Sequence, residues 1–203
     1  GFAEWGLYSM PYEDLRHFIR DLEEHNLFQW VDAEVEKDWE ISAVTRTYFR
    51  RVPKGVRGAL GFRNIKGWPG HRLVVGTVGG GEKVYRRALG IEEGFDAVNR
   101  KWSEALTRPI PAVMGNGAAP CQEVVLTGEE ADLQRFPIPT WTPDKDPGPF
   151  LTSACLVTRD RDTGVRNVGV YRMEVKGPRK TGVLWDLPSQ HGAVHFTKYE
   201  AAD

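Results

Sequence analysis

The sequence is poor in cysteine and has no long apolar run. Its 2 cysteines, Cys121 and Cys155, lie far apart and form no Cys-x-x-Cys motif, which argues against a zinc ribbon and against a disulfide-rich secreted domain. No apolar stretch reaches the roughly 18 residues of a membrane-spanning helix. The opening segment contains Glu4 but no basic region, so we expect neither a membrane span nor a signal peptide. A reducing cytoplasm is the location that these absences favour.

An excess of positive charge is also absent. Lys and Arg number 27 against 28 for Asp and Glu, a net charge of -1, so the chain lacks the electrostatic footprint of a nucleic-acid-binding protein. The triplet Gly79-Gly80-Gly81 has neither the spacing nor the Lys-Ser/Thr of a phosphate-binding loop, and a strand-ending loop is the better interpretation. The 203 residues are enough for one large domain or two small ones.

The first region mixes helical and strand patterns. Helical spacing of apolar residues predicts helices from Pro11 to near Asn26, between an N-cap at Asp38 and Pro53, and over residues 91–106. Alternating runs predict strands at residues 28–35, 59–65 and 72–78. We therefore expect an amino-terminal α/β domain over residues 1–110.

The second region, residues 111–203, begins with a connector rich in proline and glycine. It is followed by a predicted strand at 122–126, a helical turn at 129–133 and an extended proline-rich loop at 137–149. Residues 150–159 and 165–175 have the composition of a β-hairpin, with Asp160, Asp162, Thr163 and Gly164 in its turn. A further strand is expected at 182–185.

Within this hairpin, the run from Asn167 to Met173 places an amide and a guanidinium close together. On a straight strand, Asn167 and Arg172 would point to opposite faces, because side chains alternate. They could converge only if the backbone breaks register between them. Gly169 lies in that interval, and an isolated glycine in a strand is typical of a bulge or of close approach to a ligand. We therefore predict a kink at Gly169.

Several separate segments, in order, carry a resemblance to a known family. They are Thr140-Trp141-Thr142-Pro143, Gly148-Pro149-Phe150-Leu151-Thr152, Thr158-Arg159-Asp160, Asn167-Val168-Gly169-Val170-Tyr171-Arg172-Met173 and Gln190-His191, with a weaker match at Asp14-Leu15-Arg16-His17-Phe18-Ile19. Together these segments resemble the UbiD-like decarboxylases, which use prenylated FMN. The resemblance implies that the second region is the first part of a split β-barrel, similar to flavin reductases, that binds the cofactor.

The resemblance also implies a metal site. In that family, residues matching Asn167 and His191 ligate a divalent ion, usually Mn2+, which bridges to the cofactor phosphate; K+ is a further candidate ion. Such ions prefer oxygen ligands and tolerate imidazole, so an amide, an imidazole and phosphate oxygens make a reasonable partial shell. His195 lies four residues after His191, on the same face of an expected helix, and a zinc pair is the competing interpretation.

Arg172 is the catalytic residue that the resemblance implies, since its counterpart lies beside the flavin at the reacting centre. A guanidinium binds carboxylates in a bidentate fork, which suits a carboxylic acid substrate or a flavin carbonyl. The resemblance places the backbone near Val170 and Tyr171 along the cofactor and Gln190 in the pocket lining. Asn167, Arg172 and His191 complete the expected cofactor-binding set.

The implied activity is reversible, non-oxidative decarboxylation of an aromatic or α,β-unsaturated carboxylic acid. A flavin prenyltransferase would supply the cofactor, and a homo-oligomer is expected. The family's chains are more than twice as long as these 203 residues, and their glutamate metal ligand and two catalytic acids would lie beyond Asp203. We therefore expect an amino-terminal portion completed by the rest of the enzyme or by a second subunit. A noncatalytic flavin-binding or assembly subunit is the alternative, and a flavin reductase is a weaker one.

Overall fold

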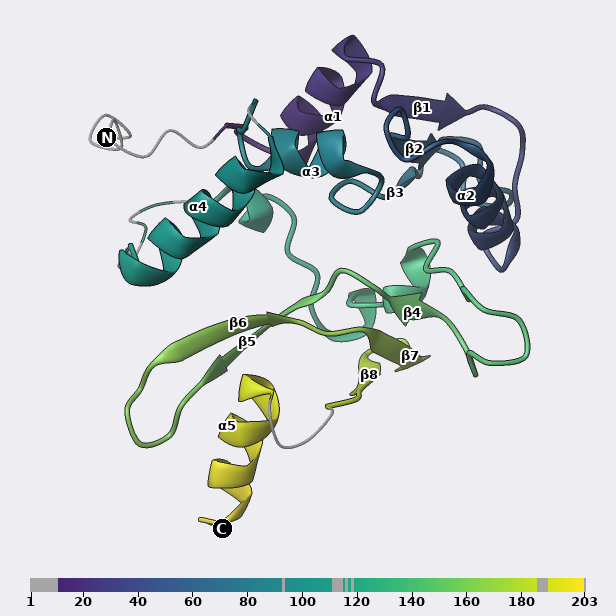
Figure 1. The fold of residues 1–203 in the computed structure, drawn as a ribbon. Coiled ribbons are helices and arrows are strands. Elements are labelled where there is room, and N and C mark those ends of the chain that lie inside the picture. Colours follow the sequence, from purple (N-terminus) through teal and green to yellow (C-terminus); the bar gives the residue numbers. More distant parts are fainter. Residues whose placement is uncertain are drawn as a thin grey trace. The chain divides into compact units, whose positions relative to one another are not determined.

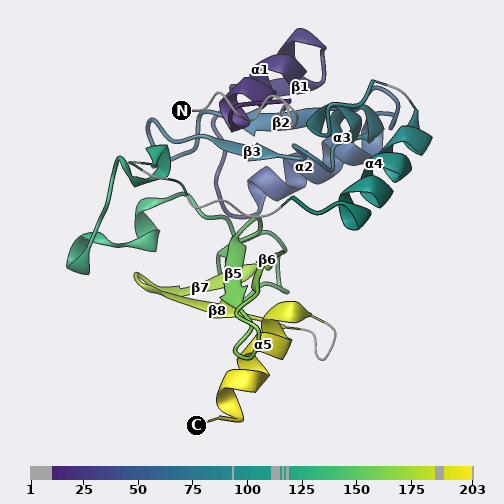
Figure 2. The same ribbon diagram turned by 90° about the vertical axis from the view of Figure 1, so that its left-hand side faces the viewer.

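The computed structural model describes residues 11–92, 94–110, 115, 117, 119–185 and 190–202 (Figures 1 and 2). Contacts divide the chain into two compact units. The first contains the described residues up to Val35 together with Ala43–Val125, and the second contains Glu36–Ser42 and the described residues from Leu126 onward. Each unit has its own sheets, and the candidate site residues all belong to the second. The chain has the mixed α/β fold that the sequence predicts.

The first unit is built on a three-stranded sheet in the order β1-β2-β3. β1 (Phe28–Val31) runs parallel to β2 (Ala59–Phe62), and β3 (Leu73–Val75) runs antiparallel to β2. A parallel neighbour requires a crossover connection, and α2 (Glu40–Arg51) lies in the connection between β1 and β2.

Helix α1 (Leu15–Glu24) supplies two residues of the core of this unit, Phe18 and Leu22. It begins at Asp14, whose carboxylate accepts a hydrogen bond from the backbone N–H of His17 at 2.7 Å, as expected of an N-cap. α3 (Glu82–Ala88) and α4 (Phe95–Thr107) follow the sheet in the chain. The buried core consists of Phe18, Leu22, Leu27, Ala59 and Val84. Phe18 and Leu22 are four residues apart, so they share one face of α1.

Several elements of the first unit differ from the prediction. The three strands are shorter than their apolar runs, and α3 was not foreseen. Asp38 was expected to cap α2, and this is wrong. Its carboxylate accepts hydrogen bonds from the backbone N–H of Thr140 at 2.7 Å and from Lys37, and Trp39 N–H donates to the Thr140 carbonyl at 2.9 Å. These bonds connect the segment Glu36–Ser42 to the second unit.

The second unit contains two small sheets. β4 (Phe150–Leu151), β7 (Met173–Gly177) and β8 (Lys180–Val183) form one in the order β4-β7-β8; β5 (Cys155–Arg159) and β6 (Arg166–Val170) form the other. Short 3-10 turns occupy Pro120–Gln122, Gly128–Glu130 and Leu133–Arg135. The strand predicted at 122–126 is wrong, since Gln122 belongs to a 3-10 turn and residues 122–126 pair with no strand of the described chain.

The predicted hairpin is present as the β5–β6 pair. Its turn follows from local chemistry: Asp160 accepts hydrogen bonds from the N–H groups of Asp162 and Thr163, both at 2.9 Å, which is the turn-forming behaviour of aspartate. Gly164 adopts a φ of 73°, a conformation that glycine reaches without steric cost. The turn residues were therefore predicted correctly.

The predicted kink at Gly169 is wrong. The β5–β6 register runs without a shift from Cys155 opposite Val170 to Arg159 opposite Arg166. The chain instead leaves this sheet at Tyr171 and Arg172, after which β7 pairs with β4 and β8. A register break does occur between Asn167 and Arg172, two residues later than predicted.

Candidate functional site

The candidate site is built where α5 (His191–Glu200) packs on the β5–β6 hairpin (Figure 1). Strand residues alternate between a more covered face and an open one. Thr158 and Asn167, which lie opposite each other in the register, are on the covered face and both contact α5 side chains. The valines of the open face, Val157, Val168 and Val170, are more than 60% exposed.

The structure brings Asn167 and His191 together. The Oδ1 atom of Asn167 lies 3.3 Å from the Nδ1 atom of His191, the first residue of α5. Gln190 precedes it at the N-cap position of that helix. The imidazole is exposed and the amide is half-buried, so both polar groups remain accessible from solvent. Asn167 is on β6 and His191 is on α5, and strands β7 and β8 lie between these two elements in the chain.

Tyr171 fixes the start of α5. Its side chain is 8% exposed, and its hydroxyl oxygen accepts a hydrogen bond from the backbone N–H of Gly192 at 3.2 Å. A Cβ atom on Gly169 would lie 2.4 Å from the Tyr171 ring, so Gly169 is needed for the close approach of this ring. A Cβ on Gly192 would lie 3.0 Å from the indole nitrogen of Trp185. Two glycines thus make room for aromatic rings beneath His191.

A charged cluster holds the later turns of α5. Asp160, 8% exposed, accepts a hydrogen bond from Nζ of Lys198 at 2.5 Å. This bond, with the backbone N–H groups of the turn, lowers the pKa of the Asp160 carboxyl below its usual range. The Nε2 atom of His195 lies 3.7 Å from the same carboxylate, and its Nδ1 atom lies 2.8 Å from the hydroxyl of Thr158. Both ring nitrogens of His195 therefore have protein neighbours, which disfavours a zinc pair with His191.

This cluster joins residues that the sequence analysis considered only separately. Asp160 was assigned to the hairpin turn and to the family-like segment Thr158-Arg159-Asp160, and Lys198 was not considered. A signal was present, because His191, His195 and Lys198 follow the spacing of one helix face. That spacing indicates which residues of α5 meet the hairpin.

Arg172 lies in a different environment. Its guanidinium is 3.7 Å from the carboxylate of Asp146. The guanidinium carbon also lies over the ring of Phe150, 4.9 Å from the ring centroid. The Asp146 carboxylate also accepts a hydrogen bond from the backbone N–H of Thr142 at 2.8 Å. The Arg172 side chain remains 58% exposed, so its guanidinium has donors available for another anion. The contacts of Arg172 differ from those of Asn167 and His191 because Arg172 follows the point where the chain changes sheets.

The pair formed by Asn167 and His191 fits part of a metal shell. Adjacent ligands of an octahedral site with bonds of about 2.1 Å are about 3 Å apart, close to the observed 3.3 Å. Among the residues that the structure describes, no three His, Cys, Asp or Glu side chains gather into a group that could hold a metal ion. The described pair can therefore supply two ligands of such a shell.

Comparison with known proteins identifies the family. Residues 19–105 match the 3-octaprenyl-4-hydroxybenzoate carboxy-lyase N-terminal domain, and residues 112–203 match the Rift-related domain of the same carboxy-lyase. The chain belongs to the UbiD family. Both the order of the two matches and the α/β architecture agree with the amino-terminal part of the UbiD fold.

Relatives of this UbiD chain include decarboxylases. It is 32% identical to the phenolic acid decarboxylase of Escherichia coli O157:H7, over 94% of this chain and 41% of that protein. Its structure resembles the UbiD-class enzyme HmfF from Pelotomaculum thermopropionicum in complex with FMN, with a TM-score of 0.77 and 30% identity over 93% of this chain and 40% of that one. For the closed form of Sedimentibacter hydroxybenzoicus vanillic acid decarboxylase, the TM-score is 0.79 and the identity 28%, over 94% and 40%.

The UbiD chain thus spans about two fifths of the length of these relatives. An evolved dimeric form of HmfF is known in complex with prFMN. In the described part of the chain, no helix has both the length and the apolar character needed to cross a membrane.

Proposed function

We propose that this chain is the amino-terminal portion of a carboxy-lyase that uses prenylated FMN to decarboxylate an aromatic or α,β-unsaturated acid, reversibly and without net oxidation. The family and the decarboxylase activities of its relatives support this proposal. The observation that carries it is the 3.3 Å approach of His191 to Asn167. Two donor groups from separate elements meet there, as a site for a metal and phosphate requires.

In this proposal, Asn167 and His191 would each give one ligand to a divalent cation, Mn2+, which would supply positive charge for holding the phosphate of the cofactor. Tyr171 holds the start of α5 through its bond to Gly192 and so keeps His191 opposite Asn167. The backbone at Val170 and Tyr171 lines the cofactor, with Gln190 beside it. Since imidazole must be neutral to ligate, acidification weakens metal binding.

Arg172 is the residue proposed to meet the substrate or a flavin carbonyl. Its guanidinium is mostly exposed, carries a permanent charge and can donate two parallel hydrogen bonds to a carboxylate. Stacking on Phe150 and the Asp146 carboxylate hold the side chain in place. When bound, the modified flavin supplies the electron sink for loss of carbon dioxide, while Arg172 orients the departing carboxylate.

We further propose that protein outside these residues completes the site, either as further chain or as a second subunit. It would supply the remaining metal ligands and the general acid, which contributes roughly 100- to 10,000-fold to such reactions. A flavin prenyltransferase would supply the cofactor, and the complete enzyme would form a homo-oligomer. The 203-residue chain alone should therefore be inactive.

The test is native mass spectrometry and Mn2+ electron paramagnetic resonance of the chain, produced with a flavin prenyltransferase, with and without the candidate remainder. We expect flavin and Mn2+ to be retained only in the larger assembly. In that assembly, Asn167→Leu and His191→Gln should each release Mn2+. The control His25→Gln should not, because His25 is the C-cap residue of α1 in the first unit. Tight retention of flavin by the chain alone would favour a noncatalytic flavin-binding module, and Mn2+ binding unchanged in both site variants would refute the metal assignment.

A further inference from the structure

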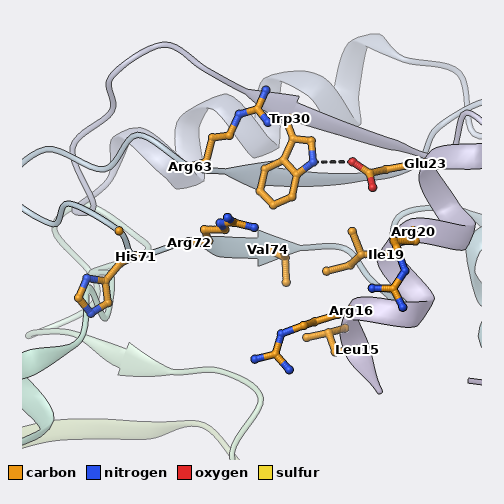
Figure 3. A pocket seen from close by; sticks show the side chains of 11 residues that line it. Leu15, Arg16, Ile19, Arg20, Glu23, Trp30, Arg63, His71, Arg72 and Val74 are labelled. Carbon is orange, nitrogen blue, oxygen red and sulfur yellow. Dashed lines mark hydrogen bonds between the residues drawn. The ribbon is translucent and has the colours of Figure 1, made fainter. Parts of the chain in front are cut away.

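The first unit contains a groove with four arginines that has no part in the proposed decarboxylase site. It encloses about 800 Å³ between α1 and the strands of the first sheet (Figure 3). Arg16 and Arg20 line it from the helix, and Arg63 and Arg72 line it from the sheet side. Leu15, Ile19 and Val74 form apolar parts of its wall. The groove thus combines cationic groups with an apolar surface.

Trp30 lies flat on the sheet within this groove because Gly61 beside it has no side chain. Trp30 on β1, Gly61 on β2 and Val74 on β3 form one row across the sheet. A Cβ atom on Gly61 would lie 2.4 Å from the Trp30 ring, so any other residue at this position would push the indole away. The indole N–H donates a hydrogen bond to the carboxylate of Glu23 on α1 at 2.6 Å. Trp30 is therefore fixed between the sheet and the helix.

The fixed indole in turn positions two guanidinium groups. Arg63 and Arg72 lie over its ring at 5.4 Å and 5.9 Å from the centroid, within the range of cation–π attraction. Figure 3 shows both beside Trp30, with Arg16 and Arg20 on the opposite wall. Arg16 and Arg20 are four residues apart, so they lie on the same face of α1. Cationic groups thus face the groove from two sides.

The four arginines differ in their carboxylate partners. Arg63 pairs with Asp32, and Arg16 lies 3.4 Å from Asp14. Within the part of the chain that the structure describes, neither Arg20 nor Arg72 lies within ion-pair distance of a carboxylate. Against these four arginines, the lining of the groove contributes the carboxylate of Glu23, so positive charge is in excess there. An anion between the guanidinium groups relieves their mutual repulsion.

We propose that this groove binds a small organic phosphate that carries at least two negative charges and an apolar or ring-shaped part. Guanidinium groups bind phosphate oxygens in a bidentate manner, and Arg20 and Arg72 would contact the phosphates from the two walls. The apolar part would lie against Leu15, Ile19 and Val74. A volume of about 800 Å³ is within the range of small-molecule sites. The proposal is independent of the decarboxylase site, which lies in the other unit.

Isothermal titration calorimetry of the 203-residue chain at low salt tests this site with three probes: ADP, pyrophosphate and adenosine. ADP should bind with a dissociation constant below about 1 mM, pyrophosphate more weakly, and adenosine undetectably. Arg20→Gln and Arg72→Gln should each weaken ADP binding about 5- to 10-fold, since each removes a charge-assisted hydrogen-bond donor. Raising the ionic strength should weaken binding further.

Arg46→Gln is the matched control, because Arg46 is an exposed arginine of α2 that does not line the groove. All three arginines are exposed, so their replacement should leave the unfolding midpoint unchanged. Binding of ADP that Arg46→Gln weakens as much as the groove variants would overturn the proposal. So would the absence of saturable binding of ADP, or binding of adenosine as tight as that of ADP.

Discussion

Replacing Gly169 with alanine tests how the hairpin holds α5 over the candidate site. The added Cβ would lie 2.4 Å from the ring of Tyr171, which is 8% exposed and has little room to move. Overpacking of this kind costs about 1–3 kcal/mol. Displacement of the ring also breaks the hydrogen bond from Gly192 N–H to the Tyr171 hydroxyl, worth about 1 kcal/mol. We therefore expect Gly169→Ala to destabilise the packing of α5 by about 2–4 kcal/mol.

Hydrogen exchange measured by mass spectrometry on α5 peptides resolves this loss, because it reports local opening separately from the first unit. A factor of ten in the opening equilibrium corresponds to about 1.4 kcal/mol, so α5 amides should exchange roughly 30- to several hundred-fold faster in Gly169→Ala. Tyr171→Phe keeps the ring and loses only the hydroxyl, and should accelerate exchange about 5-fold.

Gly177→Ala is the matched control within the same unit. Gly177 lies on β7, and nothing is within 4 Å of the position that its Cβ would take. Its replacement should leave α5 exchange within about twofold of the original, as expected of substitutions away from packed contacts. The reasoning is refuted if Gly169→Ala exchanges no faster than Gly177→Ala, because the Tyr171 ring would then not depend on the missing side chain at Gly169.

Two further predictions concern ion pairs. The pKa of Asp160 is lowered in the folded protein, so its carboxylate stabilises the fold above the ordinary aspartate pKa of about 4, and this stabilisation is lost as the pH falls below that value. The difference in urea midpoint between the original protein and Asp160→Asn should therefore shrink from pH 6 towards pH 2. A difference that stays constant over this range would contradict the prediction. Arg87→Met should cost about 2 kcal/mol or more in urea unfolding, because it leaves the carboxylate of Asp21, 16% exposed, without its guanidinium partner. Arg16→Met, at the exposed pair with Asp14, should leave the urea midpoint unchanged, and equal effects of the two substitutions would refute the role of burial.

Local chemistry in the sequence was enough to predict those elements that depend on neighbouring residues. The hairpin turn was predicted correctly because Asp160 and Gly164 act on backbone groups within four positions of themselves. The helix at α1 followed from its spacing of Phe18 and Leu22, which is also the spacing of its buried face. Both cases need no knowledge of distant chain segments.

Distant contacts explain the errors. Asp38 has the chemistry of an N-cap, but the N–H of Thr140, far along the chain, takes its carboxylate. The same holds for the cluster of Asp160 with Lys198, since its partners meet only after α5 packs on the hairpin. The approach of Asn167 to His191 was expected from the family resemblance alone. Strands β7 and β8 lie between these two residues in the chain, so local sequence patterns could not predict it.

The chain changes sheets after Val170, and this explains why Asn167 and Arg172, only five residues apart, have different neighbours. Asn167, Gly169 and Tyr171 alternate along the strand direction, and all three contribute to the packing beneath or beside α5. Arg172 is the next residue, yet its contacts are with Asp146 and Phe150, since the chain has by then begun to pair with β4. Alternation on a single strand would have sent Arg172 to the open face, where little could hold it. Because the strand ends at Val170, the guanidinium instead gains an aromatic support and a carboxylate partner while more than half of it stays exposed for an anion.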